Sequence, residues 1–230
     1  MKTLGLIGGT SWESTADYYR LLNEGVRARL GGLHSCRMVL SSVDFAGFAV
    51  LMNAGDWDAV SGRLVDEARR LRVAGADAIV LCTNTMHKVA GPIVASLDIP
   101  FLDIRDVCGR ALVAASARRP LLLGTGYTMR DDFFTAHLRA RFGLDPVVPG
   151  AADQGVVDRI IFDELCMGKV SAASRSAYVE VVTRSPEADG VIFGCTEIGM
   201  LLDRESCPKP IFDNLRLHVE AALDFALTED

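Results

Sequence analysis

The chain has 230 residues, of which 50% are hydrophobic and 23% are charged, and it carries a formal net charge of −6. This length and composition predict a globular protein with one large domain or two domains of about 110 residues. The negative charge argues against a nucleic-acid partner, and no apolar run approaches the ~18 residues that a membrane-spanning helix needs, which argues against a membrane.

The start of the chain is typical of a first strand rather than of a signal peptide, because its short apolar run leads at once into glycines. The six cysteines are scattered and include no CxxC pair. We therefore expect free thiols and a cytoplasmic location. The cysteines are Cys36, Cys82, Cys108, Cys166, Cys195 and Cys207.

Short apolar runs alternate with amphipathic stretches along the first half, which predicts alternating strands and helices. The expected strands lie at residues 3–7, 38–43, within 77–85 and at 99–103, and the expected helices at 12–29, 57–74, 86–97 and 107–117. The apolar segment 45–52 is expected to be a loop. The turn 8–11, which contains Thr10 and Ser11, opens the first helix, so it is a candidate site for an anion such as a carboxylate.

The second half shows the same alternation. The expected strands lie at residues 120–123, 145–148, 191–195 and 210–213, and the expected helices at 129–142, 155–167, 172–183 and after 213. Three landmarks of the first half recur at an offset of roughly 110 to 117 residues. A period of that length indicates a duplicated domain.

The clearest repeat pairs DAIVLCTNT at residues 77–85 with DGVIFGCTE at residues 189–197. Each stretch is typical of a strand buried on both faces and followed by small polar residues, which we call the first tip (82–85) and the second tip (194–197). In parallel α/β sheets, ligands bind beyond the carboxyl ends of the strands. The repeat therefore places Thr83 and Cys195 at equivalent positions.

The β-α order in both halves predicts an α/β fold with two tandem, pseudo-symmetric parallel-sheet domains and a cleft between them. We expect the first domain at residues 1–103, with the segment 208–230 packing back onto it. The second domain is expected at residues 104–207.

Two equivalent polar tips suit racemisation, which needs one acid/base group on each face of an α-carbon. A thiol has a pKa of about 8.5 and can exchange protons near neutral pH. The helix start that follows Cys195 is expected to lower the pKa of that thiol. The sequence has no GxGxxG fingerprint, P-loop lysine or metal-ligand cluster, so we expect chemistry without a cofactor.

Five motifs in order along almost the whole chain resemble the aspartate/glutamate racemase family: LGLIGGTSWEST, LCTNTMH, LLGTGYTM, ELCMGK and GCTEIGMLL. The resemblance implies two α/β domains, a small amino-acid substrate, no pyridoxal phosphate and often a homodimer. It also implies that Cys195 is the second catalytic residue and that Asn84 and Thr85 hold the substrate's α-carboxylate. Thr125 and Thr196 would line the cleft.

The chain departs from the family pattern at the first catalytic position, where most relatives have CNT and this chain has TNT. Either Cys82 or Thr83 could serve there. Neighbouring residues of a strand point to opposite faces, so if Thr83 points toward the substrate as Cys195 does, Cys82 points into the packing. We therefore favour Thr83, and the branch of the family with threonine here implies activity mainly on L-acidic amino acids.

Two residues, Met52 and Lys169, are candidates for contact with the side chain of the substrate. Relatives that take acidic substrates use polar groups from the segment after the second strand, whereas residues 46–52 are apolar here. Met52, at the end of that segment, is a candidate substrate contact. Lys169 is either a ligand for the second carboxylate or a lysine that complements a helix dipole.

The leading hypothesis is a cofactor-independent racemase of aspartate or glutamate. The alternatives are a one-cysteine decarboxylase or isomerase of a small dicarboxylic acid, and a non-catalytic amino-acid-binding protein, against which the intact GCTE motif argues. Glu197 is expected to cap a helix, although it could also orient the cysteine. His87 is expected in a supporting or surface role, and His218 shows no partner pattern.

Overall fold

The computed structural model describes residues 1–228, which form two compact units. Unit 1 contains residues 1–103 and the C-terminal segment from His218 onward, and unit 2 contains residues 104–217. Each unit is built on a parallel sheet with helices on its faces, which confirms the predicted α/β class. No helix in the described residues has an apolar stretch long enough to cross a membrane.

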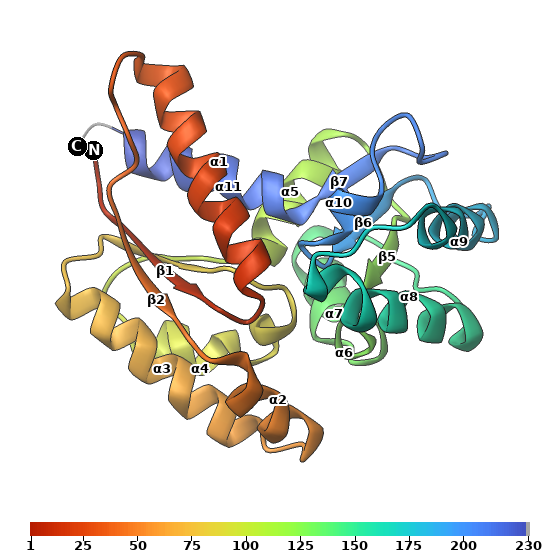
Figure 1. The fold of residues 1–230 in the computed structure, drawn as a ribbon, viewed down its shortest axis with the longest axis horizontal. Helices are drawn as coiled ribbons and strands as arrows, with labels where there is room; N and C mark the ends of the chain where they lie inside the picture. The colour runs from red at the N-terminus through yellow and green to blue at the C-terminus, as the bar shows by residue number, and fades with distance from the viewer. Residues whose placement is uncertain (229–230) are drawn as a thin grey trace. The chain divides into compact units, whose positions relative to one another are not determined.

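Unit 1 has a four-stranded parallel sheet with the order β2-β1-β3-β4. Figure 1 labels its neighbouring strands β1 and β2. Its strands are β1 (Leu4–Gly8), β2 (Met38–Ser42), β3 (Ala78–Leu81) and β4 (Phe101–Leu102). Its helices are α1 (Trp12–Leu30), α2 (Phe45–Asn53), α3 (Trp57–Val73), the 3₁₀ turn η1 (Thr85–Val89), α4 (Ala90–Ala95) and most of α11 (Asn214–Leu227). Helices α1 and α11 approach closely at Gly25, where an added Cβ would lie 2.2 Å from Leu223.

Unit 2 has a parallel sheet with the order β5-β6-β7, and Val147 adds a parallel bridge beside β5. Its strands are β5 (Leu121–Gly124), β6 (Val191–Gly194) and β7 (Ile211–Asp213). Its helices are α5 (Ile104–Ala114), α6 (Gly126–Arg130), α7 (Phe133–Phe142), α8 (Ala151–Asp163), the 3₁₀ turn η2 (Leu165–Met167), α9 (Ala172–Thr183) and α10 (Ile198–Leu201). The strand orders of the two sheets correspond, with β1, β3 and β4 matching β5, β6 and β7.

Side chains on β6 alternate between two hydrophobic cores, as expected of a strand buried on both faces. Val191 and Phe193 belong to the core that also contains Cys195. Ile192 belongs to the core on the other face, with Ile104 and Phe134. The alternation therefore carries Cys195 to the same face as Val191 and Phe193.

Two expected elements of unit 1 differ from the structure. Residues 45–52 lie in helix α2 rather than in a loop, because the side chain of Asp44 accepts a hydrogen bond from Ala46 N and caps the helix. The expected helix at 86–97 is divided into η1 and α4. Pro92 has no N–H to donate to the carbonyl of Lys88, so the α-helix begins again at Ala90 with the proline in its first turn.

Two expectations for unit 2 also need correction. The single helix expected at 129–142 is two helices, because Thr125 caps α6 at its start and Asp131 is extended at its end. Residues 208–217, expected with the first domain, lie in unit 2 because β7 pairs with β6. The C-terminal segment returns to unit 1 only from His218 onward.

A buried hydrogen-bonded chain joins α11 to the sheet of unit 1. His218 Nε2 lies 2.8 Å from the Leu102 carbonyl oxygen, and its Nδ1 lies 2.8 Å from the Tyr18 hydroxyl. A carbonyl can only accept, so Nε2 carries the proton and Nδ1 accepts from the tyrosine. Burial lowers the pKa of His218 from its ordinary 6.5 to about 4, although the Leu102 bond and the charge of Asp103 oppose this shift.

We therefore expect acid to destabilise unit 1 through His218. The unfolded state binds a proton near pH 6.5 and the folded state only near pH 4. The stability contribution of the neutral ring is thus complete above pH 6.5 and is lost as pH falls through 4, by about 3 kcal/mol in all. His218→Gln can still donate to the Leu102 carbonyl but does not titrate.

The measurement is urea unfolding at pH 7 and pH 4.5 for both proteins. The unfolding free energy of the wild type should fall more steeply with acid than that of His218→Gln. Equal pH dependence in the two proteins would show that His218 is not the acid-sensitive group.

Candidate active site

The carboxyl ends of β1 and β3 lie side by side in unit 1. Ile7 pairs in register with Leu81, and the next residue, Cys82, donates its N–H to the Ile7 carbonyl over 2.9 Å. The turn after β1 and the first tip after β3 therefore leave the sheet together. This is the end of a parallel sheet at which ligands bind.

The turn after β1 leaves polar groups available for a ligand. Gly9 has φ +91 and donates its N–H to Thr15 Oγ1, which holds the turn against the start of α1. The hydroxyls of Thr10, Ser11 and Ser14 are buried and have no hydrogen-bond partner among residues 1–228. Ser11 occupies the N-cap position of α1, but its side chain makes no capping bond. Three unpaired hydroxyls beside a helix N-terminus suit an anion such as a carboxylate.

The first tip places Cys82 and Thr83 in different surroundings. Cys82 is 1% exposed, its Sγ lies 3.9 Å from the Val80 carbonyl oxygen, and burial raises the pKa of its thiol far above the usual value. Thr83 is partly exposed, whereas Asn84 and Thr85 are buried. This arrangement favours Thr83 over Cys82 as the residue that meets a substrate.

In unit 2, β5 and β6 end together in the same way. Gly124 pairs in register with Gly194, and a Cβ on Gly124 would lie only 2.9 Å from the Gly194 carbonyl oxygen. Thr125 and Cys195 are therefore the next residues on adjacent strands. Thr125 caps α6 by accepting a hydrogen bond from Thr128 N.

The second tip contains a thiol–carboxylate pair. Cys195 Sγ donates to Glu197 Oε2 over 2.9 Å, and Thr196 Oγ1 donates to the same oxygen over 2.9 Å. Glu197 is only 3% exposed. A carboxylate this close to a buried thiol can accept its proton. The tip therefore places a proton acceptor in direct contact with the thiol.

The expectation that the helix start lowers the pKa of Cys195 is wrong. Burial, followed by the negative charge of Glu197, raises the pKa of this thiol well above its usual value. Helix α10 has only four residues, so its dipole is small compared with these two effects. Cys195 is therefore a thiol at neutral pH, and the carboxylate of Glu197 must take its proton before it can act as a base.

The two remaining candidates, Met52 and Lys169, lie outside both tips. Met52 is 5% exposed within α2. Lys169 is exposed, follows Gly168 in the left-handed region at φ +68, and donates its backbone N–H to the Glu164 carbonyl. No ion pair in the part of the chain that the structure describes involves Lys169.

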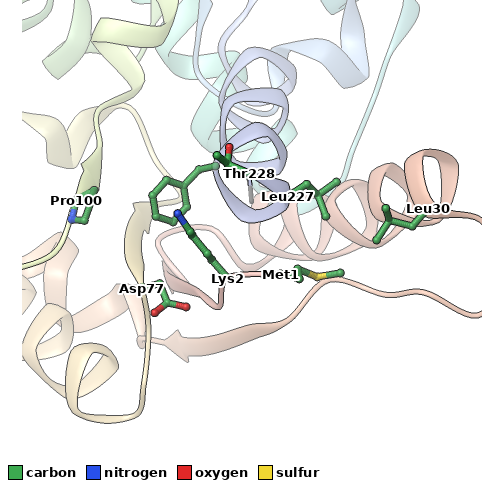
Figure 2. A pocket seen from close by; sticks show the side chains of 8 residues that line it. Met1, Lys2, Leu30, Asp77, Pro100, Leu227 and Thr228 are labelled. Atoms are coloured by element: carbon green, nitrogen blue, oxygen red, sulfur yellow. The ribbon is translucent and has the colours of Figure 1, made fainter. Parts of the chain in front are cut away.

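Figure 2 shows a pocket of about 620 Å³ at the opposite, amino end of the unit 1 sheet. Its two charged side chains already have partners, because Asp77 accepts from Thr3 N and the Lys2 ammonium lies 5.1 Å from the Phe225 ring centre. Ligands of parallel sheets bind at the other end of the strands. The pocket is therefore a poor candidate for the active site.

Sequence reasoning missed Ser14, and it favoured a capping function for Glu197 over contact with the cysteine. Ser14 lies one residue before the threonine that braces the turn after β1, and nothing in the sequence marks its hydroxyl as unpaired. The position of Glu197 two residues after Cys195 was a usable signal, but an acid at a helix start is equally typical of capping. Within residues 1–228, no group of three or more His, Cys, Asp or Glu side chains could hold a metal ion.

Comparison with known proteins finds similarity to amino-acid racemases in both sequence and structure. The family model for Asp/Glu/hydantoin racemases matches residues 7–222. A broad-specificity amino-acid racemase of Bacillus subtilis strain 168, RacX, is 27% identical over 161 residues, which is 69% of each chain.

Two solved structures are similar over nearly the whole chain. A protein from Yersinia pestis described as a candidate Asp/Glu racemase is 44% identical, with a TM-score of 0.92 over 99% of this chain and 100% of its own. An aspartate racemase homologue from Pyrococcus horikoshii OT3 is 30% identical, with a TM-score of 0.87 over 99% of this chain and 100% of its own.

Proposed function

The chain belongs to the Asp/Glu/hydantoin racemase family, and from that premise we propose that it interconverts L- and D-aspartate or L- and D-glutamate without pyridoxal phosphate. The observation that carries the proposal is the buried Cys195–Glu197 pair at the end of β6. A protein that only bound amino acids would need neither a buried thiol nor a carboxylate to accept its proton.

The proposed reaction uses one group on each face of the α-carbon. Glu197 accepts the thiol proton, and the Cys195 thiolate then removes the α-hydrogen from one face. The Thr83 hydroxyl donates a proton to the other face, which inverts the configuration. In the reverse direction Thr83 removes the proton and Cys195 donates one.

Hydroxyl and amide groups are proposed to hold the substrate's carboxylates. By the family resemblance, Asn84 and Thr85 would bind the α-carboxylate, with Thr125 and Thr196 as further contacts in unit 2. The unpaired hydroxyls of the turn after β1 supply additional donors beside the positive end of α1. Lys169 would pair with the side-chain carboxylate, while the apolar helix α2 with Met52 would cover the substrate.

The test is a chiral-product assay on the purified protein with no cofactor added, starting from each enantiomer of aspartate, glutamate and a panel of neutral amino acids. We expect aspartate, glutamate or both to approach equal amounts of the L and D forms, because enantiomers have equal free energies in water. Activity that disappears on removal of pyridoxal phosphate and returns on its addition would contradict the mechanism. Turnover of the neutral amino acids alone would contradict the proposed substrate.

Glu197→Gln tests the role of the carboxylate. The variant keeps an oxygen that can accept the thiol hydrogen bond but cannot take the proton, so racemisation should fall by about 10²- to 10⁴-fold. Because the charge of Glu197 helps to raise the pKa of Cys195, its removal should also lower that pKa. The rate of Cys195 alkylation by iodoacetamide, followed by peptide mass spectrometry, should then rise at a lower pH than in the wild type. An unchanged alkylation profile together with full activity would exclude this role for Glu197.

A further inference from the structure

His87 is fully buried directly behind the first tip. Its Nδ1 lies 2.7 Å from the carbonyl oxygen of Thr83, so the ring donates that hydrogen bond. Its Nε2 lies 4.0 Å from Asp103 Oδ1, a carboxylate that follows β4. The ring is packed against Phe101 and His218, with centroid distances of 5.4 and 6.2 Å. His87 therefore joins the first tip to the end of the neighbouring strand and to α11.

The backbone of Thr83 is held from both sides. Its N–H donates to the Leu81 carbonyl over 2.8 Å, and its own carbonyl accepts from His87. With both of these backbone groups bonded, the remaining freedom of Thr83 is mainly rotation about χ1, which is itself restricted in a β-branched residue. The direction of the Thr83 hydroxyl thus depends on the histidine that fixes its carbonyl.

Unit 2 has no histidine at the position equivalent to His87. The tip alignment puts Gly199 at the position of His87, and the PFLD and PIFD motifs put Asp213 at the position of Asp103. A Cβ on Gly199 would lie 3.0 Å from Asp213 Oδ2, so the carboxylate in unit 2 approaches the backbone where a side chain stands in unit 1. The partner of the reacting group in unit 2 is Glu197. A histidine at this position is thus a feature of the threonine half alone.

We propose that His87 is the positioning residue for proton transfer by Thr83, acting through the Thr83 carbonyl. The inference rests on the proposed racemase function. It concerns one face of the substrate only, because Cys195 has its own partner in Glu197. Loss of His87 should therefore impair the Thr83 reaction selectively, whereas a general loss of folding would impair both.

The test compares three variants in D₂O. In His87→Leu the hydrogen bond to Thr83 is lost; in His87→Asn the side-chain Nδ2 can take the place of Nδ1 and donate again; in His87→Gln the amide extends toward the place of Nε2. For each protein, NMR follows two rates from each pure enantiomer: inversion, and deuterium uptake with retained configuration. Near-UV circular dichroism checks that each variant is folded.

We expect His87→Leu to slow inversion by at least ~10-fold, since small displacements of a reacting group have large effects on rate. Deuterium uptake with retention from the enantiomer that faces Cys195 should stay within about twofold of wild type, because the Cys195–Glu197 pair is intact. His87→Asn should recover most of the inversion rate and His87→Gln little of it.

Equal losses of both rates in a folded His87→Leu, or a His87→Asn no better than His87→Leu, would overturn the positioning role. A wild type that neither inverts nor exchanges any tested amino acid would instead overturn the proposed function itself, and the inference with it.

Discussion

Replacing Cys195 with alanine is expected to abolish racemisation while leaving the protein folded, and replacing Cys82 with alanine is expected to leave most of the activity. Cys195 is hydrogen-bonded to Glu197 at the end of β6, and its removal takes away the group proposed to transfer the proton on one face of the α-carbon. The loss should be at least ~10³-fold, within the range seen when a general acid or base is removed. Chiral chromatography of the product measures it.

Cys82→Ala is the matched control, because it removes a thiol that takes no part in the proposed mechanism. Cys82 is 1% exposed and packs within unit 1, so its loss should cost on the order of 1 kcal/mol of unfolding free energy and little rate. Urea unfolding checks both variants. A folded Cys82→Ala protein that is as inactive as Cys195→Ala would contradict this prediction. Cys82 would then be the first catalytic group, and Cys82 rather than Thr83 would face the substrate.

The strands and their polar ends could be predicted from the sequence because the duplication presents each of them twice. Residues 77–85 and 189–197 support one another, and the position of each strand follows from a short apolar run that ends in small polar residues. The structure has both strands, with parallel neighbours that also correspond. A pattern that occurs twice in one chain is less open to chance than either copy alone.

Helix α2 could not be predicted from periodicity, because residues 45–53 are apolar or small almost throughout and have no polar face to set a period. The contacts of His87 were hidden for a different reason. They depend on the 3₁₀ turn η1, which begins at Thr85 and brings His87 back to the Thr83 carbonyl. They also depend on His218, which the chain supplies from the far end of its sequence.

The two proposed catalytic groups, Cys195 and Thr83, differ in the hydrogen-bond partners of their side chains. Cys195 has a carboxylate partner at 2.9 Å, whereas the hydrogen bonds of Thr83 in the described part of the chain are those of its backbone N–H and carbonyl. His87 contacts the carbonyl of Thr83 and not its hydroxyl. A threonine hydroxyl is too weak an acid to ionise unaided at neutral pH. Proton removal should therefore be faster on the face of the α-carbon that meets Cys195 than on the face that meets Thr83.

The inequality can only be kinetic. Enantiomers have equal free energies in water, so the values of kcat/KM in the two directions must be equal whatever the catalytic groups are. Deuterium uptake with retained configuration is free of this constraint, because it needs only one group to remove a proton and return a deuteron. From the enantiomer that faces Cys195, uptake in D₂O should exceed inversion. From the other enantiomer, uptake should be no faster than inversion.

Thr83→Cys should remove much of this asymmetry. A thiol is more acidic than a hydroxyl by several pKa units and can serve as acid and base on its own face. Deuterium uptake with retention should then appear from the enantiomer that faces residue 83, and inversion should speed up in both directions together. By the family resemblance we expect the L enantiomer to be the one that exchanges faster in the wild type. The measurement is NMR of the α-proton, starting from each pure enantiomer with wild type and variant. Equal uptake from both enantiomers in the wild type would mean that an acid/base group as effective as the Cys195–Glu197 pair serves the first face, and Thr83 alone could not be that group.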